Sequence, residues 1–210
     1  MTQAVFVEMF GDPVKNERGW IETVLGEITT FTGGGTPSRK RPEFFEGSIC
    51  WATSKDMKGE FLDDTKEHIT NEAIAQSATK LVPSGTILMV VKSKILAHTL
   101  PIVITRVPTC FGQDIKGINV SARANVTFIA TALRVKELWF LKRARGINTE
   151  GLTLDHLRDF PLLLPPLPLQ QEFARRVESI EKLKGSQRAS LAEMETLFKA
   201  LQGRAFRGEL

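Results

Sequence analysis

The sequence of 210 residues contains only two cysteines and three histidines. Cys50 and Cys110 are too few for a disulfide framework and lie too far apart in the chain for a zinc knuckle. His68, His98 and His156 have no companion at the spacing of a metal-binding motif. These absences predict a reducing, cytoplasmic environment and a chain that holds no metal ion and no cofactor.

Long apolar runs are also missing. The stretch from Thr86 to Val91 ends at Lys92, and prolines break the stretch around Leu163. Neither reaches the length of about 20 residues that a helix needs to cross a bilayer. Residues 1–12 carry no basic residue before their apolar stretch and end in an acid, which is unlike a secretory signal. We therefore expect no membrane partner.

Sequence motifs of catalysis are absent or incomplete. The triple glycine Gly33–Gly35 lacks the Gly-Lys-Ser/Thr of a P-loop and the third glycine of a dinucleotide fingerprint. Neither an Asn-Pro-Pro-aromatic stretch nor a helicase signature is present, so we expect no methyl transfer and no ATP hydrolysis. Asp56 with Asp64-Thr65-Lys66 partly matches Mg²⁺-dependent nucleases, and Cys110 with His98 offers a nucleophile and a base by residue type alone. Such short patterns often arise by chance, so we predict no catalytic residues.

Charge is uneven along the chain, although the net charge is only +4. Residues 1–79 hold 8 basic and 13 acidic residues, residues 80–167 hold 12 and 5, and residues 168–210 hold 8 and 6. A basic excess like that of the middle section neutralises phosphates. It is also compatible with an ordinary solvated surface. The middle section is therefore the candidate for contact with nucleic acid.

The residue pattern predicts an α+β fold, in which a mixed α/β domain is followed by a long C-terminal helix. Strands are expected at residues 48–53, 85–91, 102–106, 118–120 and 126–129, and helices at 71–79 and 130–144. Prolines up to Pro168 predict that the final helix begins after that residue. The expected divisions are residues 1–13 as a short segment that belongs with a preceding unit, 14–164 as the domain, and 165–210 as the helix and a closing tail.

The final helix carries apolar residues in a seven-residue repeat, which is typical of a coiled coil. The predicted pairing positions are Phe173, Val177, Ile180, Lys184, Gln187, Leu191, Met194, Phe198 and Leu201. These pairing positions form a line along the helix, which we call the seam. Lys184 and Gln187 are polar and interrupt it, and there they can fix register or the choice of partner. A helix over residues 169–201 would be about 50 Å long, so we expect it to pair with another molecule or domain. The alternative is a surface helix folded against its own domain.

Several segments, in this order, resemble the specificity (S) subunit of type I restriction-modification systems. They are Trp20 with 25–28, Gly34–Ser38, Gly47–Asp56, Gly112–Gly117, Pro165–Glu172 and Phe206–Leu210. The most specific combination is a Gly-Gly-Thr-Pro loop, a strand before Lys55-Asp56, and a Pro-Pro-Leu-Pro-Leu-Gln-Gln stretch that leads into the helix. Together the segments cover nearly the whole chain.

The resemblance implies a non-catalytic subunit whose target-recognition domain reads one half of a bipartite site in double-stranded DNA. The helix would space this domain from a second one and dock the methyltransferase (M) subunits, with a restriction (R) subunit completing the enzyme. In the family, the modification subunit binds S-adenosylmethionine and the restriction subunit uses ATP and Mg²⁺, so the resemblance implies no cofactor here. A full S subunit has two domains and two helices, whereas this chain has one of each. We therefore expect a homodimer through the C-terminal helix, and the alternative is a truncated half of a longer gene.

The candidates for DNA contact are chosen by chemistry, because target sequences differ between members of the family. Gln pairs with adenine, Lys and Arg pair with guanine, and Ser or Thr contacts base edges or phosphates. The candidates are Thr36, Ser38, Arg39, Lys40, Ser54, Lys55, Lys92, Lys94, His98, Gln113 and Lys116. The rival function is a coiled-coil scaffold that binds only protein.

Overall fold

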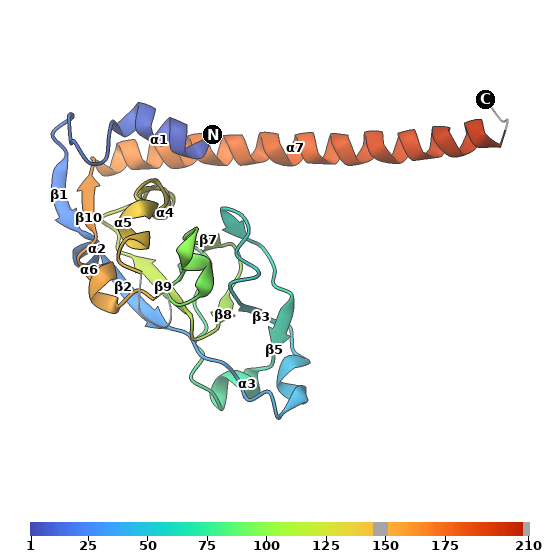
Figure 1. The fold of residues 1–210 in the computed structure, drawn as a ribbon, viewed down its shortest axis with the longest axis horizontal. Coiled ribbons are helices and arrows are strands. Elements are labelled where there is room, and N and C mark those ends of the chain that lie inside the picture. The colour runs from blue at the N-terminus through green and yellow to red at the C-terminus, as the bar shows by residue number, and fades with distance from the viewer. Residues whose placement is uncertain (145–150, 208–210) are drawn as a thin grey trace.

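The computed structural model describes residues 1–144 and 151–207, so Gly208 to Leu210 of the closing tail lie outside the described residues. The elements in chain order are α1 (Thr2–Phe10), β1 (Ile21–Val24), α2 (Leu25–Ile28), β2 (Thr29–Gly33), η1 (Pro42–Phe45), β3 (Ile49–Ala52), β4 (Phe61–Leu62), β5 (Glu67–Ile69), α3 (Asn71–Ala75), β6 (Ile87–Val90), η2 (Lys94–Ala97), β7 (Ile102–Thr105), β8 (Thr109–Phe111), β9 (Ile115–Val120), α4 (Val126–Val135), α5 (Glu137–Leu141), α6 (Leu154–Arg158), β10 (Pro161–Leu164) and α7 (Leu167–Phe206). α7 spans 40 residues and projects far beyond the rest of the molecule (Figure 1). The predicted α+β fold with a long C-terminal helix is confirmed.

Within the described residues, the strands form three sheets. The largest has the order β2-β9-β6-β7-β4, and the second has the order β5-β3-β8. All residues of β6, from Ile87 to Val90, are buried, because this strand lies in the middle of the large sheet. The third sheet pairs β1 with β10 antiparallel, with Ile21 opposite Leu164 and Val24 opposite Pro161. The strand near the start of the domain is thus hydrogen-bonded to the strand immediately before α7.

An aromatic cluster attaches α7 to the domain. Phe6 and Phe10 of α1, Phe128 of α4 and Phe173 of α7 are buried, and neighbouring ring centroids lie 4.9 to 5.6 Å apart. Aromatic pairs at such distances contribute about 0.5–1.5 kcal/mol each beyond the burial of their area. α1 therefore lies along the first part of α7, as Figure 1 shows, and both pack on α4.

Residues 126–129 begin helix α4, so the prediction of a strand there is wrong. The side chain of Asn125 accepts hydrogen bonds from the backbone N–H groups of Thr127 and Phe128. Such an N-cap stabilises a helix by about 0.5–2 kcal/mol. The cap and the burial of Phe128 outweigh the preference of Val126 and Thr127 for extended backbone.

The start of α7 also differs from the prediction. The helix begins at Leu167, so Pro168 lies in its first turn and does not precede it. Proline is tolerated there because the first N–H groups of a helix have no partner within the helix. The buried side chain of Gln170 accepts a hydrogen bond from the backbone N–H of Asn125 (2.9 Å) and donates one to the carbonyl oxygen of Pro165 (2.7 Å). These bonds fix the direction in which α7 leaves the domain. Among the described residues, no helix is both long and apolar enough to cross a membrane.

Candidate functional site

The glycine loop that follows β2 lies against the segment that follows β8. The backbone N–H of Gly35 donates to the carbonyl oxygen of Phe111 (2.9 Å), and the N–H of Gly112 donates to that of Ala52 (3.0 Å). A Cβ atom on Gly34 would lie 2.2 Å from the carbonyl oxygen of Gly112, so a side chain there would force the backbone apart. The glycine loop, the end of β3 and the turn between β8 and β9 are therefore held together.

A further contact brings the segment after β6 to the same turn. The backbone N–H groups of Val91 and Lys92 both donate to the carbonyl oxygen of Asp114, at 2.8 and 3.3 Å. Lys92, Lys94 and Gln113 are exposed. Predicted DNA-contact residues from two separate segments of the chain therefore lie on adjacent loops.

All predicted DNA-contact residues are accessible to solvent to some degree. The exposed ones are Thr36, Ser38, Arg39, Lys40, Lys55, Lys92, Lys94, His98 and Gln113, and the partly exposed ones are Ser54 and Lys116. Lys116 lies opposite Gly33 in the register of β2 and β9, at the end of the sheet where the glycine loop begins. His98 directly follows η2. The contacts of these residues with DNA remain predictions.

Arg39 has a competing partner within the domain. Its guanidinium group donates two hydrogen bonds to the carboxylate of Glu67, at 2.5 and 2.8 Å, and lies over the rings of Phe45 and Trp51. The hydrogen bond to Glu67 raises the pKa of Arg39, and the same bond lowers the pKa of Glu67. Arg39 would have to give up Glu67 in order to pair with a phosphate or a guanine.

Some basic side chains of the middle section, residues 80–167, stabilise the fold through hydrogen bonds to backbone carbonyl groups. Arg134 donates to the carbonyl oxygens of Glu60 and Ile102, and burial lowers its pKa. Lys136 donates to the carbonyl oxygen of Pro161, and burial lowers its pKa as well. A count of charges therefore overstates the basic surface, because it includes side chains that bind backbone carbonyl groups.

Asp56 and Cys110, from the two weak catalytic patterns, have surroundings that suit structural roles. Burial raises the pKa of Asp56, but hydrogen bonds from Thr53 and from the N–H of Lys66 outweigh this effect and lower the pKa overall. The Asp56 carboxylate thus closes a turn. Cys110 is fully buried, and burial raises the pKa of its thiol to about 11, whereas His98 is exposed. A thiol with such a pKa stays protonated at neutral pH and is a poor nucleophile.

The predicted pairing positions of α7 fall into two sets. Phe173 and Val177 are 0% exposed within the chain's own core, and Ile180 and Lys184 are partly exposed. The positions Gln187, Leu191, Met194, Phe198 and Leu201 are exposed. We call residues 167–184 the proximal part of α7 and residues 185–206 the distal part. In this structure, the seam of the proximal part is largely occupied by the domain itself, and the seam of the distal part is open.

Apart from Gln187, the exposed pairing positions form an open apolar stripe on α7, and two further leucines widen it. Leu183 and Leu197 are 64% and 59% exposed. The strict seven-residue positions do not include them. Leu197 lies three residues after Met194, and residues three and four apart share one face of a helix, so a wider helical pattern would have included it.

Polar loops gathered at one edge of a domain, together with a projecting helix whose apolar stripe is open, define a binding module. The sequence pattern of the family described as "Type I restriction modification DNA specificity domain" matches residues 17–195. This match covers well over half of the chain, so the chain belongs to that family. The family prediction is confirmed, with a single recognition domain in this chain. The match is to the specificity component, in agreement with the prediction that the chain is not the catalytic subunit.

Named relatives are specificity subunits. The chain is 35% identical over 159 residues to the "Type I restriction enzyme EcoR124I/EcoR124II specificity subunit" of Escherichia coli, with 75% of this chain and 39% of the relative covered. It is 30% identical over 84 residues to the MjaIX specificity subunit of Methanocaldococcus jannaschii, with 39% of this chain and 19% of the relative covered. The chain therefore spans well under half the length of these relatives.

Solved structures share the fold. The HsdS subunit of Thermoanaerobacter tengcongensis matches all of this chain with a TM-score of 0.61 at 18% identity, and 50% of that structure is covered. The S subunit of a type I restriction-modification system from M. genitalium matches 93% of this chain with a TM-score of 0.63 at 14% identity, again over 50% of that structure. A structure from a study of complex assembly in a type I R-M system gives 0.64 at 18% identity, with 51% covered. The present fold thus corresponds to about half of each of these structures.

Proposed function

We propose that this chain is a non-catalytic specificity subunit that reads one half of a bipartite target in double-stranded DNA. It would act in the cytoplasm, dock methyltransferase subunits and, in a complete enzyme, a restriction subunit, and leave S-adenosylmethionine, ATP and Mg²⁺ to those subunits. The observation that carries the proposal is the convergence of exposed polar loops around Gly112 in a chain of this family. Adjacent loops with lysine and glutamine side chains offer the two kinds of contact that DNA recognition needs, to phosphates and to base edges.

Lys92 and Lys94 would bind the DNA backbone. The double variant Lys92→Ala/Lys94→Ala should weaken binding to all duplexes and reduce the salt dependence of the affinity by a slope of about two, one for each phosphate that a lysine no longer neutralises. Fluorescence anisotropy at several salt concentrations measures both effects. Lys15→Ala is the matched control, because Lys15 is exposed in the loop between α1 and β1 and pairs only loosely with Glu17 (3.7 Å). An unchanged slope in the double variant would remove these lysines from the interface.

Gln113 would read a base. The variant Gln113→Ala should leave binding to random duplex unchanged and weaken binding to the target by about 1–3 kcal/mol, because alanine cannot form the two hydrogen bonds that glutamine makes with a base edge. The target is obtained by mixing the chain with its methyltransferase subunit and S-adenosylmethionine and mapping the adenines that become methylated. Equal losses on target and random duplex would assign Gln113 to the backbone instead.

The distal part of α7 would pair with a second copy of the chain, so that two recognition domains read a roughly symmetric site. Leu191, Met194 and Phe198 are 53%, 60% and 66% exposed, and burying a side chain of this size contributes about 1.5–3 kcal/mol. The distal part is about 30 Å long, which corresponds to about three seven-residue repeats. Polar Gln187 at one end of the seam would help to set the register.

Sedimentation velocity over a range of protein concentrations tests this pairing. The wild-type chain should dimerise, and Met194→Glu/Phe198→Glu should remain monomeric because charges cannot be buried in the seam. Thr196→Glu, which places a charge on the exposed opposite face of the helix, should dimerise like the wild type. A wild-type chain that stays monomeric at high concentration would refute the homodimer.

The rival function is a scaffold that binds only protein. Its supporting observation is the open apolar stripe of α7, which by itself requires a partner but no DNA. An electrophoretic shift with random duplex separates the two functions. The specificity subunit should retard the duplex at low salt, and the scaffold should not.

A further inference from the structure

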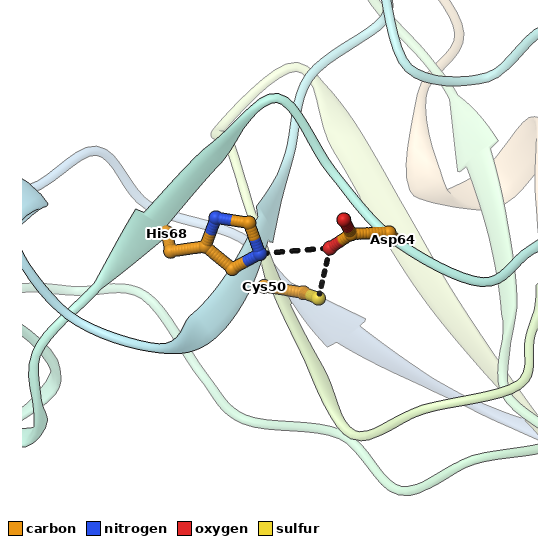
Figure 2. A group of neighbouring side chains, drawn as sticks. All are labelled: Cys50, Asp64 and His68. Atoms are coloured by element: carbon orange, nitrogen blue, oxygen red, sulfur yellow. Dashed lines mark hydrogen bonds and ion pairs between the residues drawn. The ribbon is translucent and has the colours of Figure 1, made fainter.

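A thiol, a carboxylate and an imidazole meet at the edge of the small β5-β3-β8 sheet. Cys50 of β3 and His68 of β5 lie opposite each other in the antiparallel register, and Asp64 comes from the short segment before β5. One oxygen of Asp64, Oδ1, lies 3.4 Å from Cys50 Sγ and 2.7 Å from His68 Nε2, as Figure 2 shows. The three potential ligand atoms all lie within 4.8 Å of one another. Sequence spacing did not predict this set, because pairing of the strands brings residues 50 and 68 together.

We propose that Cys50, Asp64 and His68 bind a single Zn²⁺ ion. Thiolate and imidazole ligands favour a borderline transition metal such as zinc, whereas Mg²⁺ and Ca²⁺ prefer sets made of oxygen. Tetrahedral zinc, with bonds of about 2.0–2.3 Å, places its ligand atoms about 3.3–3.5 Å apart. The distance from sulfur to oxygen already has this value. The Asp64–His68 contact would have to open by about half an ångström, and the sulfur and the imidazole nitrogen, which lie within 4.8 Å of each other, would have to close to about 3.5 Å. Small rotations of the exposed Asp64 and partly exposed His68 side chains provide both changes.

The surroundings of the three ligands suit a site with one open position. Cys50 is 8% exposed, while the side chains of His68 and Asp64 are 31% and 73% exposed. The ion would thus be held from inside by sulfur and would face solvent, where water supplies the fourth ligand. Binding would break the hydrogen bond between Asp64 and His68, leave the proton of the neutral imidazole on Nδ1 so that Nε2 is free to bind the ion, and release the thiol proton of Cys50 to solvent.

Thr65 orders the segment that carries Asp64. Its hydroxyl group accepts a hydrogen bond from the backbone N–H of Trp51 (3.0 Å) and donates one to the carbonyl oxygen of Glu67 (2.7 Å). The residue next to Asp64 is therefore fixed between β3 and β5. Ordering of this kind around ligands strengthens metal binding, because less freedom is lost when the ion binds.

The same three residues do not form a catalytic triad. A cysteine nucleophile needs a base in contact with its sulfur, and the third group then orients the base. Here the carboxylate lies between the sulfur and the imidazole, so Cys50 contacts the acid. The order of the groups is wrong for proton transfer from sulfur to imidazole, whereas a shared central ion needs no such order.

The position of the site links it to a predicted DNA-contact turn. The backbone N–H of Lys66 donates to the carboxylate of Asp56 (3.1 Å), which closes the turn that carries Ser54 and Lys55. An ion held by Asp64 would therefore stabilise the segment on which this turn rests. The metal proposal itself stands on the geometry of the three ligands and does not depend on DNA binding.

Cobalt titration of the full chain, after removal of metal with a chelator, tests the proposal. Co²⁺ should bind one ion per chain, with an absorption band of thiolate-to-cobalt charge transfer that Zn²⁺ then abolishes. Cys50→Ala should lose the band, and His68→Gln should weaken Zn²⁺ affinity by more than about tenfold. Cys110→Ala and His98→Gln are the matched controls, a buried cysteine on the neighbouring strand and an exposed histidine, and both should bind as the wild type does.

Thermal unfolding provides a second measurement. Zn²⁺ should raise the Tm of the wild type and of Cys110→Ala, because an ion that binds only the folded state stabilises it, and should not raise that of Cys50→Ala. Circular dichroism checks that each variant is folded, and the exposed His68→Gln remains informative if Cys50→Ala is not. A folded wild type without the band, or a band that survives in Cys50→Ala, would overturn the proposal. Because no DNA is present, a failure here is distinct from a failure of DNA recognition.

Discussion

The two parts of α7 follow one sequence repeat but have opposite surroundings. In the proximal part, Phe173 and Val177 are 0% exposed, because α1 and α4 cover them. In the distal part, Met194 and Phe198 are 60% and 66% exposed. The same seven-residue spacing thus marks an internal core at one end of the helix and an open surface at the other. A repeat shows which side chains share a face, and only the tertiary structure shows what covers that face.

The sharpest test of this difference compares two phenylalanines on one helix. Phe173→Ala should lower the free energy of unfolding by about 3–5 kcal/mol, because it leaves a cavity in the aromatic cluster. Phe198→Ala should change it by no more than about 0.5 kcal/mol in the monomer, because the ring already contacts solvent. Urea unfolding at low protein concentration measures both. Similar losses for the two variants would mean that the distal part is covered within the monomer.

Gln170 should give the next largest effect. Gln170→Leu removes two buried hydrogen bonds and leaves the N–H of Asn125 and the carbonyl group of Pro165 without these partners. We expect a loss of about 1–3 kcal/mol in urea unfolding. The control is Gln171→Leu, since Gln171 is exposed at the adjacent position, and it should be close to neutral. Equal effects in the two variants would show that the hydrogen bonds of Gln170 do not hold α7 on the domain.

Gly185 lies at the junction of the two parts, and replacing it should stabilise the helix. A Cβ atom at this position would meet no other atom within 4 Å. Gly185→Ala should therefore add about 0.8–1.0 kcal/mol of helix propensity and raise the temperature at which far-ultraviolet circular dichroism loses its helical signal. Destabilisation would indicate that a partner approaches the helix closely at Gly185.

The smallest effect is expected from the surface of the proximal part. Arg176 pairs with Glu172 at 2.6 Å, one turn apart on the exposed side of the helix. Arg176→Ala should cost no more than about 0.5 kcal/mol, because water and salt screen such a pair. A larger loss in urea unfolding, persisting at high salt, would show that the stem of Arg176 packs on the domain.

The sequence was sufficient for the fold class, for the strands with strong apolar runs and for the long helix. The prediction from sequence was wrong at two places where a single side chain determines the local backbone structure. Asn125 turns a β-branched stretch into helix α4, and Pro168 is accepted in the first turn of α7. Neither outcome follows from propensity, because both depend on which backbone N–H groups lack a partner at a helix start.

The candidate sites were predictable to different degrees. Exposed polar loops could be identified by residue type, but only the fold shows that Lys92 and Gln113 lie on adjacent loops joined through Asp114. The grouping of Cys50 with His68 was not predictable, because it depends on strand register, which a short alternating pattern specifies weakly.

The ladder between β1 and β10 brings the beginning and the end of the domain together. Its first and last strands lie side by side, with Ile21 opposite Leu164 and Val24 opposite Pro161. The chain therefore enters and leaves the domain at one place, next to the start of α7. Residues 25–160 can be exchanged for those of a relative without moving the helix, provided that Asn125 and Phe128 keep their contacts with it. Under the proposed function, such an exchange would transfer the recognition loops as one unit.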